Sequence, residues 1–166
     1  MLYLDASALV KRYVDEHDGA TAIMDQFMVD AGRWGGLTSS EWLILEVTSA
    51  LTRKLRGGTI ASDTYQRLLP WFRADAERLR LIEVKRGVPL AASRLMETVQ
   101  GADRFHSGDA IHLHTAMQLQ IDLDASDTLV FVTSDDGLRS VVARYNIPAF
   151  DPRSDRIPDL ERLIDG

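Results

Sequence analysis

Four acidic residues stand where short apolar segments end or apolar helical segments begin. They are Asp5, Glu46, Asp109 and Asp135. An unpaired carboxylate in such surroundings is costly to remove from water. Two carboxylates about 5 Å apart also repel each other by roughly 3 kcal/mol at an effective dielectric constant near 20. A divalent cation is the simplest group that could hold such acids together. The residues therefore predict a metal site, and such a site favours hydrolysis of a phosphodiester.

Two of these acids follow apolar segments that have the character of buried strands. Asp5 follows residues 2–4, and Asp135 lies two residues after the continuous apolar run at 129–133. Ligands of open parallel sheets bind beyond the carboxyl ends of the strands. We therefore expect Asp5 and Asp135 to project toward the same edge of one sheet.

The other two acids lie on predicted helices. Asp109 is in the first turn of its helix, where the partial positive charge of free amide groups favours a carboxylate. Glu46 is expected to face inward, because its helix neighbours three and four positions away are Trp42, Leu43, Ser49 and Ala50. Hard oxygen ligands suit magnesium or manganese, so Mg²⁺ or Mn²⁺ is the predicted ion.

Each acid also has a simpler interpretation when it is taken alone. Asp5 could be a turn or cap residue, and Asp109 could stabilise only its own helix. Glu46 could be a partly exposed helix charge, and Asp135 with Asp136 could form a solvated turn. The combination of all four at compatible positions favours the metal site.

The elements that must position these acids alternate between short strands and longer helices. Strands are expected at 2–4, 79–84, 129–133 and 147–150, and helices at 8–14, 20–30, 39–56, 61–77, 90–100, 108–120, 136–145 and 158–164. Ser7 and Ser107 are the expected N-caps of two helices, and Ser39 and Ser40 are expected to open a third. The fold class is therefore α/β, with a parallel sheet of four to five strands covered by helices on both faces. Residues 1–166 are expected to form a single domain.

The composition excludes several other classes of protein. The chain is 45% hydrophobic and 27% charged, and no window approaches the roughly 18 apolar residues that span a membrane. No secretory signal precedes the first strand, so a cytoplasmic location is expected. Cysteine is absent, and His112 and His114 diverge on their helix, so neither a thiolate nor a histidine metal site is favoured. The net charge of −6 argues against binding nucleic acid by bulk electrostatics.

Four segments of the chain resemble the PIN-domain family, and within it the VapC toxins of bacterial toxin–antitoxin pairs. They are residues 4–11, 45–51, 108–113 and 132–138, in the family's order and at similar spacing. The resemblance implies a metal-dependent endoribonuclease with Asp5, Glu46, Asp109 and Asp135 as its catalytic and metal-binding acids. It also implies Ser7 and Thr133 as supporting hydroxyls, an RNA substrate, a homodimer, and an antitoxin that occludes the site. Because Thr133 lies two residues before Asp135, Asp135 is favoured over Asp136 as the fourth acid.

Some assignments stay open from the sequence alone. Lys11 and Arg12 could contact the RNA backbone or could be surface charges, and the same holds for Arg53, Lys54 and Arg56. Within the fold, an RNA-processing nuclease without a toxin role and a non-catalytic interaction module are the alternatives. A phosphoaspartate phosphatase is disfavoured, because Ser7 stands where that pattern requires a second aspartate. Segment 121–127 has no assigned role.

Overall fold

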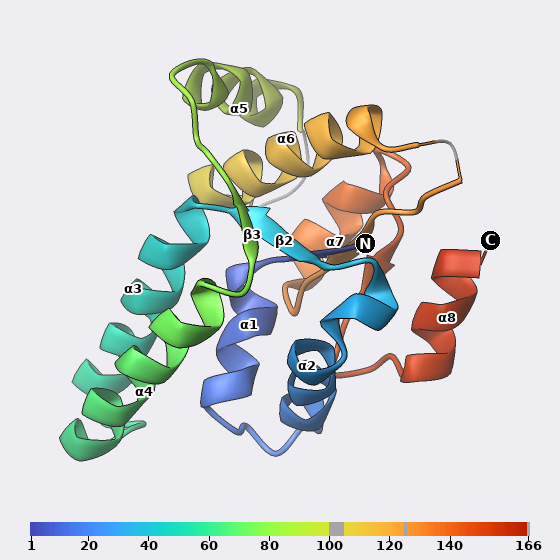
Figure 1. Cartoon of the computed structure of the whole chain (residues 1–166). Helices are drawn as coiled ribbons and strands as arrows, with labels where there is room; N and C mark the ends of the chain where they lie inside the picture. Colours follow the sequence, from blue (N-terminus) through green and yellow to red (C-terminus); the bar gives the residue numbers. More distant parts are fainter. Residues whose placement is uncertain (100–104, 125, 166) are drawn as a thin grey trace.

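A computed structural model describes residues 1–99, 105–124 and 126–165 of the chain (Figure 1). Within these residues, five strands form one all-parallel sheet in the order β3-β2-β1-β4-β5. The strands are β1 (Leu2–Leu4), β2 (Leu37–Ser40), β3 (Arg80–Ile82), β4 (Val130–Val132) and β5 (Ala149–Phe150). The helices are α1 (Ala6–Tyr13), α2 (Ala20–Val29), the 3-10 helix η1 (Ala31–Trp34), α3 (Trp42–Arg56), α4 (Ser62–Ala76), α5 (Gly87–Thr98), α6 (Ser107–Asp122), α7 (Asp136–Ala143) and α8 (Ile157–Asp165).

The alternation of side chains along β1 divides the core into two layers. Leu2 and Leu4 pack in one cluster with apolar residues of α1, α2, α3, α4 and α8. Tyr3 points to the opposite face, where it stacks on Phe131 of β4 and packs with α6 and α7. Figure 1 shows α1 and α2 on one side of the strands and α6 and α7 on the other. The predicted α/β class, with a parallel sheet covered on both faces, is confirmed.

The strand order creates a crevice at the carboxyl end of β1. This strand pairs with β2 on one side and with β4 on the other, and Leu4 is in register with Val132. The chain therefore reverses its direction of winding at β1, which is the position where open parallel sheets bind ligands. Asp5 and Thr133, the residues that follow the two paired strands, leave the sheet side by side.

Strand β2 was not among the predicted strands, and the helix expected from residue 39 begins instead at Trp42. Thr38, Ser39 and Ser40 are buried although they are polar. Their hydroxyls are satisfied internally: Thr38 Oγ1 donates to the Arg80 carbonyl at 2.7 Å, and Ser39 Oγ donates to the Leu4 carbonyl at 2.6 Å. Ser40 Oγ lies 3.3 Å from Nδ1 of His112 on α6. A strand whose polar side chains are paired inside the protein has no hydrophobic pattern to reveal it.

The expected caps were also wrong at two helices. Asp5, not Ser7, is the N-cap of α1, and α6 begins at Ser107 with His106 as its N-cap. The carboxylate of Asp109 accepts a hydrogen bond from the His106 amide at 2.6 Å, which closes a capping box. The predicted end of one helix at residue 100, and part of segment 121–127, fall outside the described residues.

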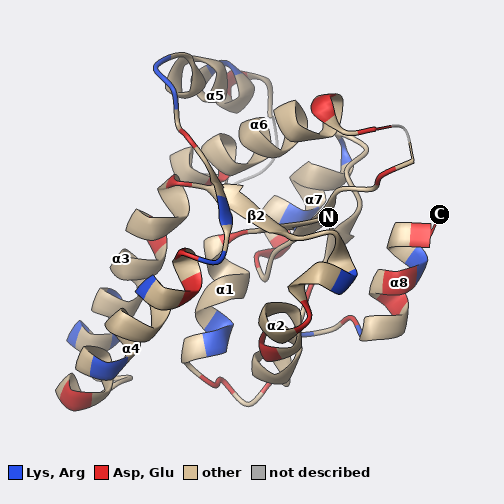
Figure 2. Cartoon of the chain, viewed as in Figure 1, with Lys and Arg blue, Asp and Glu red and all other residues tan. Residues whose placement is uncertain are grey.

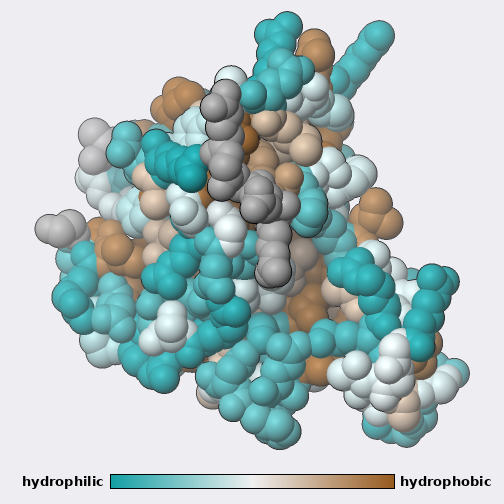
Figure 3. Space-filling model, turned by 180° about the vertical axis from the view of Figure 1, so that it is seen from behind, coloured by the Kyte–Doolittle hydropathy of each residue, from teal (hydrophilic) through white to brown (hydrophobic). Residues whose placement is uncertain are grey.

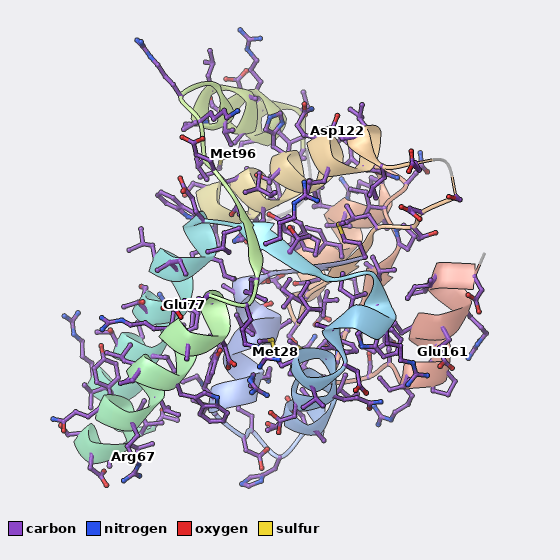
Figure 4. All side chains as sticks on the ribbon, viewed as in Figure 1. Met28, Arg67, Glu77, Met96, Asp122 and Glu161 are labelled. Atoms are coloured by element: carbon purple, nitrogen blue, oxygen red, sulfur yellow. The ribbon has the colours of Figure 1, made fainter. Side chains whose placement is uncertain are left out.

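The surface carries isolated apolar side chains. In Figure 3, hydrophobic residues on the rear face form small separate patches among hydrophilic ones. Figure 4 shows Met28 among the interior side chains and Arg67 and Asp122 at the periphery, in line with their burial. No helix within the described part of the chain combines the length and the apolarity needed to cross a membrane.

Candidate metal centre

All four predicted acids line one open groove of about 430 Å³. Asp5 follows β1, Glu46 lies on α3, Asp109 on the first turn of α6, and Asp135 at the turn between β4 and α7. Residues far apart in the sequence thus meet because two adjacent strand ends and two helix starts share one edge of the sheet. The volume is within the range of pockets that hold small molecules.

Asp5 is held by hydroxyl groups rather than by cations. It is 4% exposed, and its Oδ2 accepts from Ser7 Oγ at 2.5 Å, from the Ser7 amide at 3.1 Å and from Thr133 Oγ1 at 3.0 Å. Within the described residues, all three hydrogen bonds are accepted by the same oxygen, Oδ2. Asp5 Oδ1 therefore stays available to a ligand in the groove.

The two hydroxyls also join the ends of β1 and β4. Ser7 Oγ lies 3.2 Å from Thr133 Oγ1 and accepts from the Ser134 amide at 2.9 Å. Thr133 Oγ1 accepts from the Asp135 amide at 3.1 Å. The structure thus brings Ser7 and Thr133 against Asp5 and fixes the backbone from which Asp135 projects.

Asp135 and Asp136 occupy different surroundings. Asp135 lines the groove, and its Oδ1 accepts from the Leu138 amide at 2.9 Å as the N-cap of α7. The Asp136 side chain is 82% exposed and forms an ion pair with Arg153 at 2.8 Å. Of this pair, Asp135 is the acid that belongs to the groove.

Glu46 is oriented by a buried histidine that sequence reasoning missed. His112 on α6 is 0% exposed, and its Nε2 lies 2.6 Å from Glu46 Oε2. Its Nδ1 lies 3.0 Å from the hydroxyl of Tyr3, which in turn accepts from the Ser40 amide at 3.1 Å. We infer that the Tyr3 hydroxyl donates to Nδ1 and that Nε2–H donates to Glu46. The available signal was spacing, because residue 112 follows Asp109 by three positions and shares its helix face.

Gly108 leaves room for the Glu46 carboxylate. A Cβ atom at residue 108 would lie 1.8 Å from Glu46 Oε1 and 2.9 Å from its Cδ. Real Cβ atoms do not approach other heavy atoms so closely. Because His112 holds the other oxygen of Glu46, the carboxylate and a side chain at 108 compete for the same space.

Within the described residues, the four acids form no ion pair with a lysine or an arginine. No Lys or Arg in the described ranges lies within 4.0 Å of the carboxylate oxygens of the four acids. Burial, together with the negative charges of Asp5 and Asp135, raises the pKa of Asp109 to about 6. Burial opposes protonation of His112, but the hydrogen bond to Glu46 and the nearby acids outweigh it and raise the pKa of His112. A bound cation would relieve this repulsion.

The donor set fits a hard divalent ion. Asp5, Glu46 and His112 offer ligand atoms that lie within 4.8 Å of one another. Both ring nitrogens of His112 already make hydrogen bonds, so we assign it the role of orienting Glu46. The remaining donors are carboxylate oxygens, which are typical ligands of magnesium and manganese.

The basic residues that were candidates for RNA contact differ in whether they reach the groove. Arg12 does not reach the groove: it is buried, pairs with Asp75 at 2.8 Å and with Asp25, and lies over the Trp71 ring. Its role is to join α1 to α2 and α4. Lys11 and Arg53 do line the groove.

The fold and this constellation of acids agree with a comparison against known families. Residues 2–143 match the family model of the PIN domain, and the chain belongs to that family. PIN domains are generally metal-dependent nucleases, so the membership indicates a nuclease. Among curated proteins, no sequence matches this chain.

Proposed function

We propose that this protein is an endoribonuclease that depends on Mg²⁺ or Mn²⁺. One observation carries the proposal: four carboxylates of a PIN domain line one groove, and within the described residues none of them forms an ion pair with a Lys or Arg. Leu160 of α8, beyond the family match, packs in the same core as β1. This packing supports the proposal that residues 1–166 form one nuclease domain.

Each side chain has a role in this proposal. Asp5 and Asp109 are the first choice as direct metal ligands, with Glu46 and Asp135 as further ligands or as acceptors of bound water. The ion, when present, lowers the pKa of a water molecule and stabilises charge on the phosphodiester. His112 holds Glu46 toward the groove, where its carboxylate can accept a proton from the attacking water. Ser7 and Thr133 fix the orientation of Asp5.

An RNA substrate is compatible with the charge of the molecule. The net charge of −6 argues against strong binding by bulk electrostatics, so we expect the contacts with RNA to be local. The groove is open and carries cations at one end, Lys11 and Arg53, and acids at the other. We propose that RNA lies along this groove.

We further propose that the chain is the toxin of a type II toxin–antitoxin pair, that it forms a homodimer in the cytoplasm, and that its antitoxin covers the groove. The four sequence segments that resemble VapC toxins support this proposal. An RNA-processing nuclease without a toxin role is the alternative within the same chemistry. A non-catalytic interaction module is disfavoured, because all four acids are present and share one groove.

Cleavage of RNA by the purified protein tests the nuclease proposal. We expect cleavage with Mg²⁺ or Mn²⁺, loss of cleavage with a chelator, and its return when the ion is restored. Asp5→Asn should reduce the rate of cleavage by about 100-fold or more. Changing a residue that supports a metal ligand usually costs about 10- to 100-fold, and the loss of a ligand itself should cost more. The circular dichroism spectrum of the variant should match that of the wild type. Cleavage that persists in the chelator would refute the metal mechanism.

Expression in bacteria tests the toxin role separately. The wild-type chain should arrest growth and Asp5→Asn should not, and co-expression of the protein encoded beside it should restore growth. If wild-type protein cleaves RNA in vitro but does not slow growth at high expression, the RNA-processing alternative is favoured.

A further inference from the structure

The groove has a basic end as well as an acidic one. Helices α1 and α3 lie side by side, and each runs from the acid cluster toward basic residues near its other end (Figures 1 and 2). Lys11 on α1 and Arg53 on α3 line the groove together with Glu16, which lies in the loop after α1. This end is therefore built from two helices and one loop.

Glu16 occupies the position between two lysines. Its Oε2 accepts from Lys11 Nζ, and its Oε1 accepts from Lys54 Nζ at 2.5 Å. The hydrogen bonds from these two lysines keep the pKa of Glu16 below its usual value, so it stays negatively charged. Two ammonium groups from different helices thus converge on one anion at the wall of the groove.

Arg53 adds a third cation beside this pair. Its side chain is exposed, and within the described residues its hydrogen bond is to the hydroxyl of Ser49 at 2.9 Å, not to a carboxylate. A guanidinium group with unused donors is well suited to a phosphate. Lys11, Arg53 and Lys54 carry three positive charges, against the two carboxylates of Glu16 and of Asp18, which pairs with Lys11 at 2.6 Å.

We propose that Lys11, Arg53 and Lys54 form a subsite for a backbone phosphate that flanks the scissile one, and that Glu16 is the resident counter-ion which this phosphate displaces. The inference rests on the proposed nuclease function and deepens it. RNA that reaches the acid cluster must extend along the groove, and the basic end is where the next negative charge is accommodated. Glu16 lowers the affinity for RNA because the phosphate must compete with its carboxylate.

Binding of RNA to an inactive protein tests the subsite. The probe is a labelled single-stranded RNA of about 12 nucleotides, bound to the Asp5→Asn protein across about 50 to 200 mM salt. Adding Glu16→Gln should tighten binding by roughly two- to fivefold at low salt, the range of one exposed ion pair. It should also steepen the salt dependence, because the freed lysines collect counter-ions that RNA then releases.

Two further variants make the test specific. Lys54→Ala should weaken binding and reduce the slope of log Kd against log salt by about 0.7, as expected for one lost phosphate contact. Glu97→Gln makes the same change of charge at an exposed position of α5 outside the groove, and it should leave both quantities unchanged. Thermal melting of each variant separates effects on folding from effects on binding.

The outcomes distinguish this inference from the function on which it rests. If wild-type protein cleaves RNA but Glu16→Gln binds no more tightly than Glu97→Gln, the subsite is refuted and the nuclease stands. If Glu16→Gln lowers the melting temperature and leaves RNA binding unchanged, the subsite is also refuted. Glu16 would then only tie the loop to the helices. If the wild-type protein does not cleave RNA, the proposed function itself fails.

Discussion

Glu46 reaches the groove because residue 108 has no side chain. The Glu46 carboxylate lies between the imidazole of His112 and the backbone of Gly108, and its Oε2 is 2.6 Å from His112 Nε2. A metal-binding acid needs both an orienting partner and free space, and here they come from one helix, α6. His112 and Gly108 are therefore as much a part of the proposed metal centre as the acid that they position.

Gly108→Ala tests this arrangement at the scale of one methyl group. The new Cβ would occupy the place of Glu46 Oε1, so we expect the carboxylate to turn out of the groove. Cleavage should fall by about 10- to 100-fold, the usual effect of disturbing a residue that supports a metal ligand. The assay is RNA cleavage at saturating Mn²⁺, with Mn²⁺ affinity measured in parallel.

Gly87→Ala is the matched control, because among the described residues no heavy atom beyond its chain neighbours and its own helix backbone lies within 4 Å of a Cβ at that position. It should cleave RNA at the wild-type rate. Full activity of Gly108→Ala would mean that Glu46 is not needed at its present position.

At the scale of elements, the site depends on the junction between β1 and β4. Thr133 is the first residue after β4, and its hydroxyl donates to Asp5 and accepts from the Asp135 amide. Two acids that leave different strands are thus tied to each other through one side chain. The parallel register of Leu4 with Val132 is what makes this contact possible.

Thr133→Val should break the junction while keeping the shape of the side chain. We expect the free energy of unfolding to fall by about 1–3 kcal/mol, because buried polar groups lose their partner. Mn²⁺ affinity should fall by about 10- to 100-fold. Chemical denaturation and metal titration measure the two effects, and Thr133→Ser, which keeps the hydroxyl, should restore most of both. Equal losses in the serine and valine variants would contradict the role of the hydroxyl.

The sequence predicted elements well where apolar patterns were strong and poorly where polar groups were buried. The run at 129–133 predicted β4, because a short continuous apolar run rich in β-branched residues is typical of a strand that is buried on both faces. Strand β2 was missed because Thr38, Ser39 and Ser40 are polar yet buried, with hydroxyl partners inside the protein. His112 was missed for the same reason, since its partners Tyr3 and Glu46 come from elements distant in the sequence.

For the candidate site, the sequence located the acids but not their surroundings. The positions of Asp5 and Asp135 at adjacent strand ends follow from the logic of parallel sheets. The burial of Arg12 against Asp75, by contrast, depends on how α1 packs on α4, which no local pattern reveals. The same limit applies to Gly108, whose role depends on a contact with α3.

For the whole molecule, the acid cluster links stability to pH and, in the proposed metal centre, to a bound ion. The pKa of Asp109 is raised from 3.8 to about 6 in the folded protein. The folded state therefore binds a proton more tightly than the unfolded state, and this group's contribution to stability is lost as the pH rises from about 4 to 6. The raised pKa of His112 acts in the same direction at higher pH. In the proposed metal centre, a divalent ion would displace the proton of Asp109, so metal binding would oppose the loss.

We accordingly expect Mg²⁺ or Mn²⁺ to raise the melting temperature more at pH 7 than at pH 5. Asp109→Asn should reduce this difference and should make the metal-free protein less sensitive to pH over the same interval. Calorimetric melting curves with and without metal at both pH values provide the measurement. An equal metal effect at the two pH values would show that Asp109 is not titrated on binding.

The most direct test of the metal centre is anomalous diffraction from crystals of the wild-type protein soaked with Mn²⁺. From the proposed metal centre we expect a manganese peak in the groove, coordinated by Asp5 and Asp109 and close to Glu46 and Asp135, and no such peak in Asp5→Asn. Manganese bound elsewhere, or a groove without manganese in a protein whose RNA cleavage requires Mn²⁺, would contradict it.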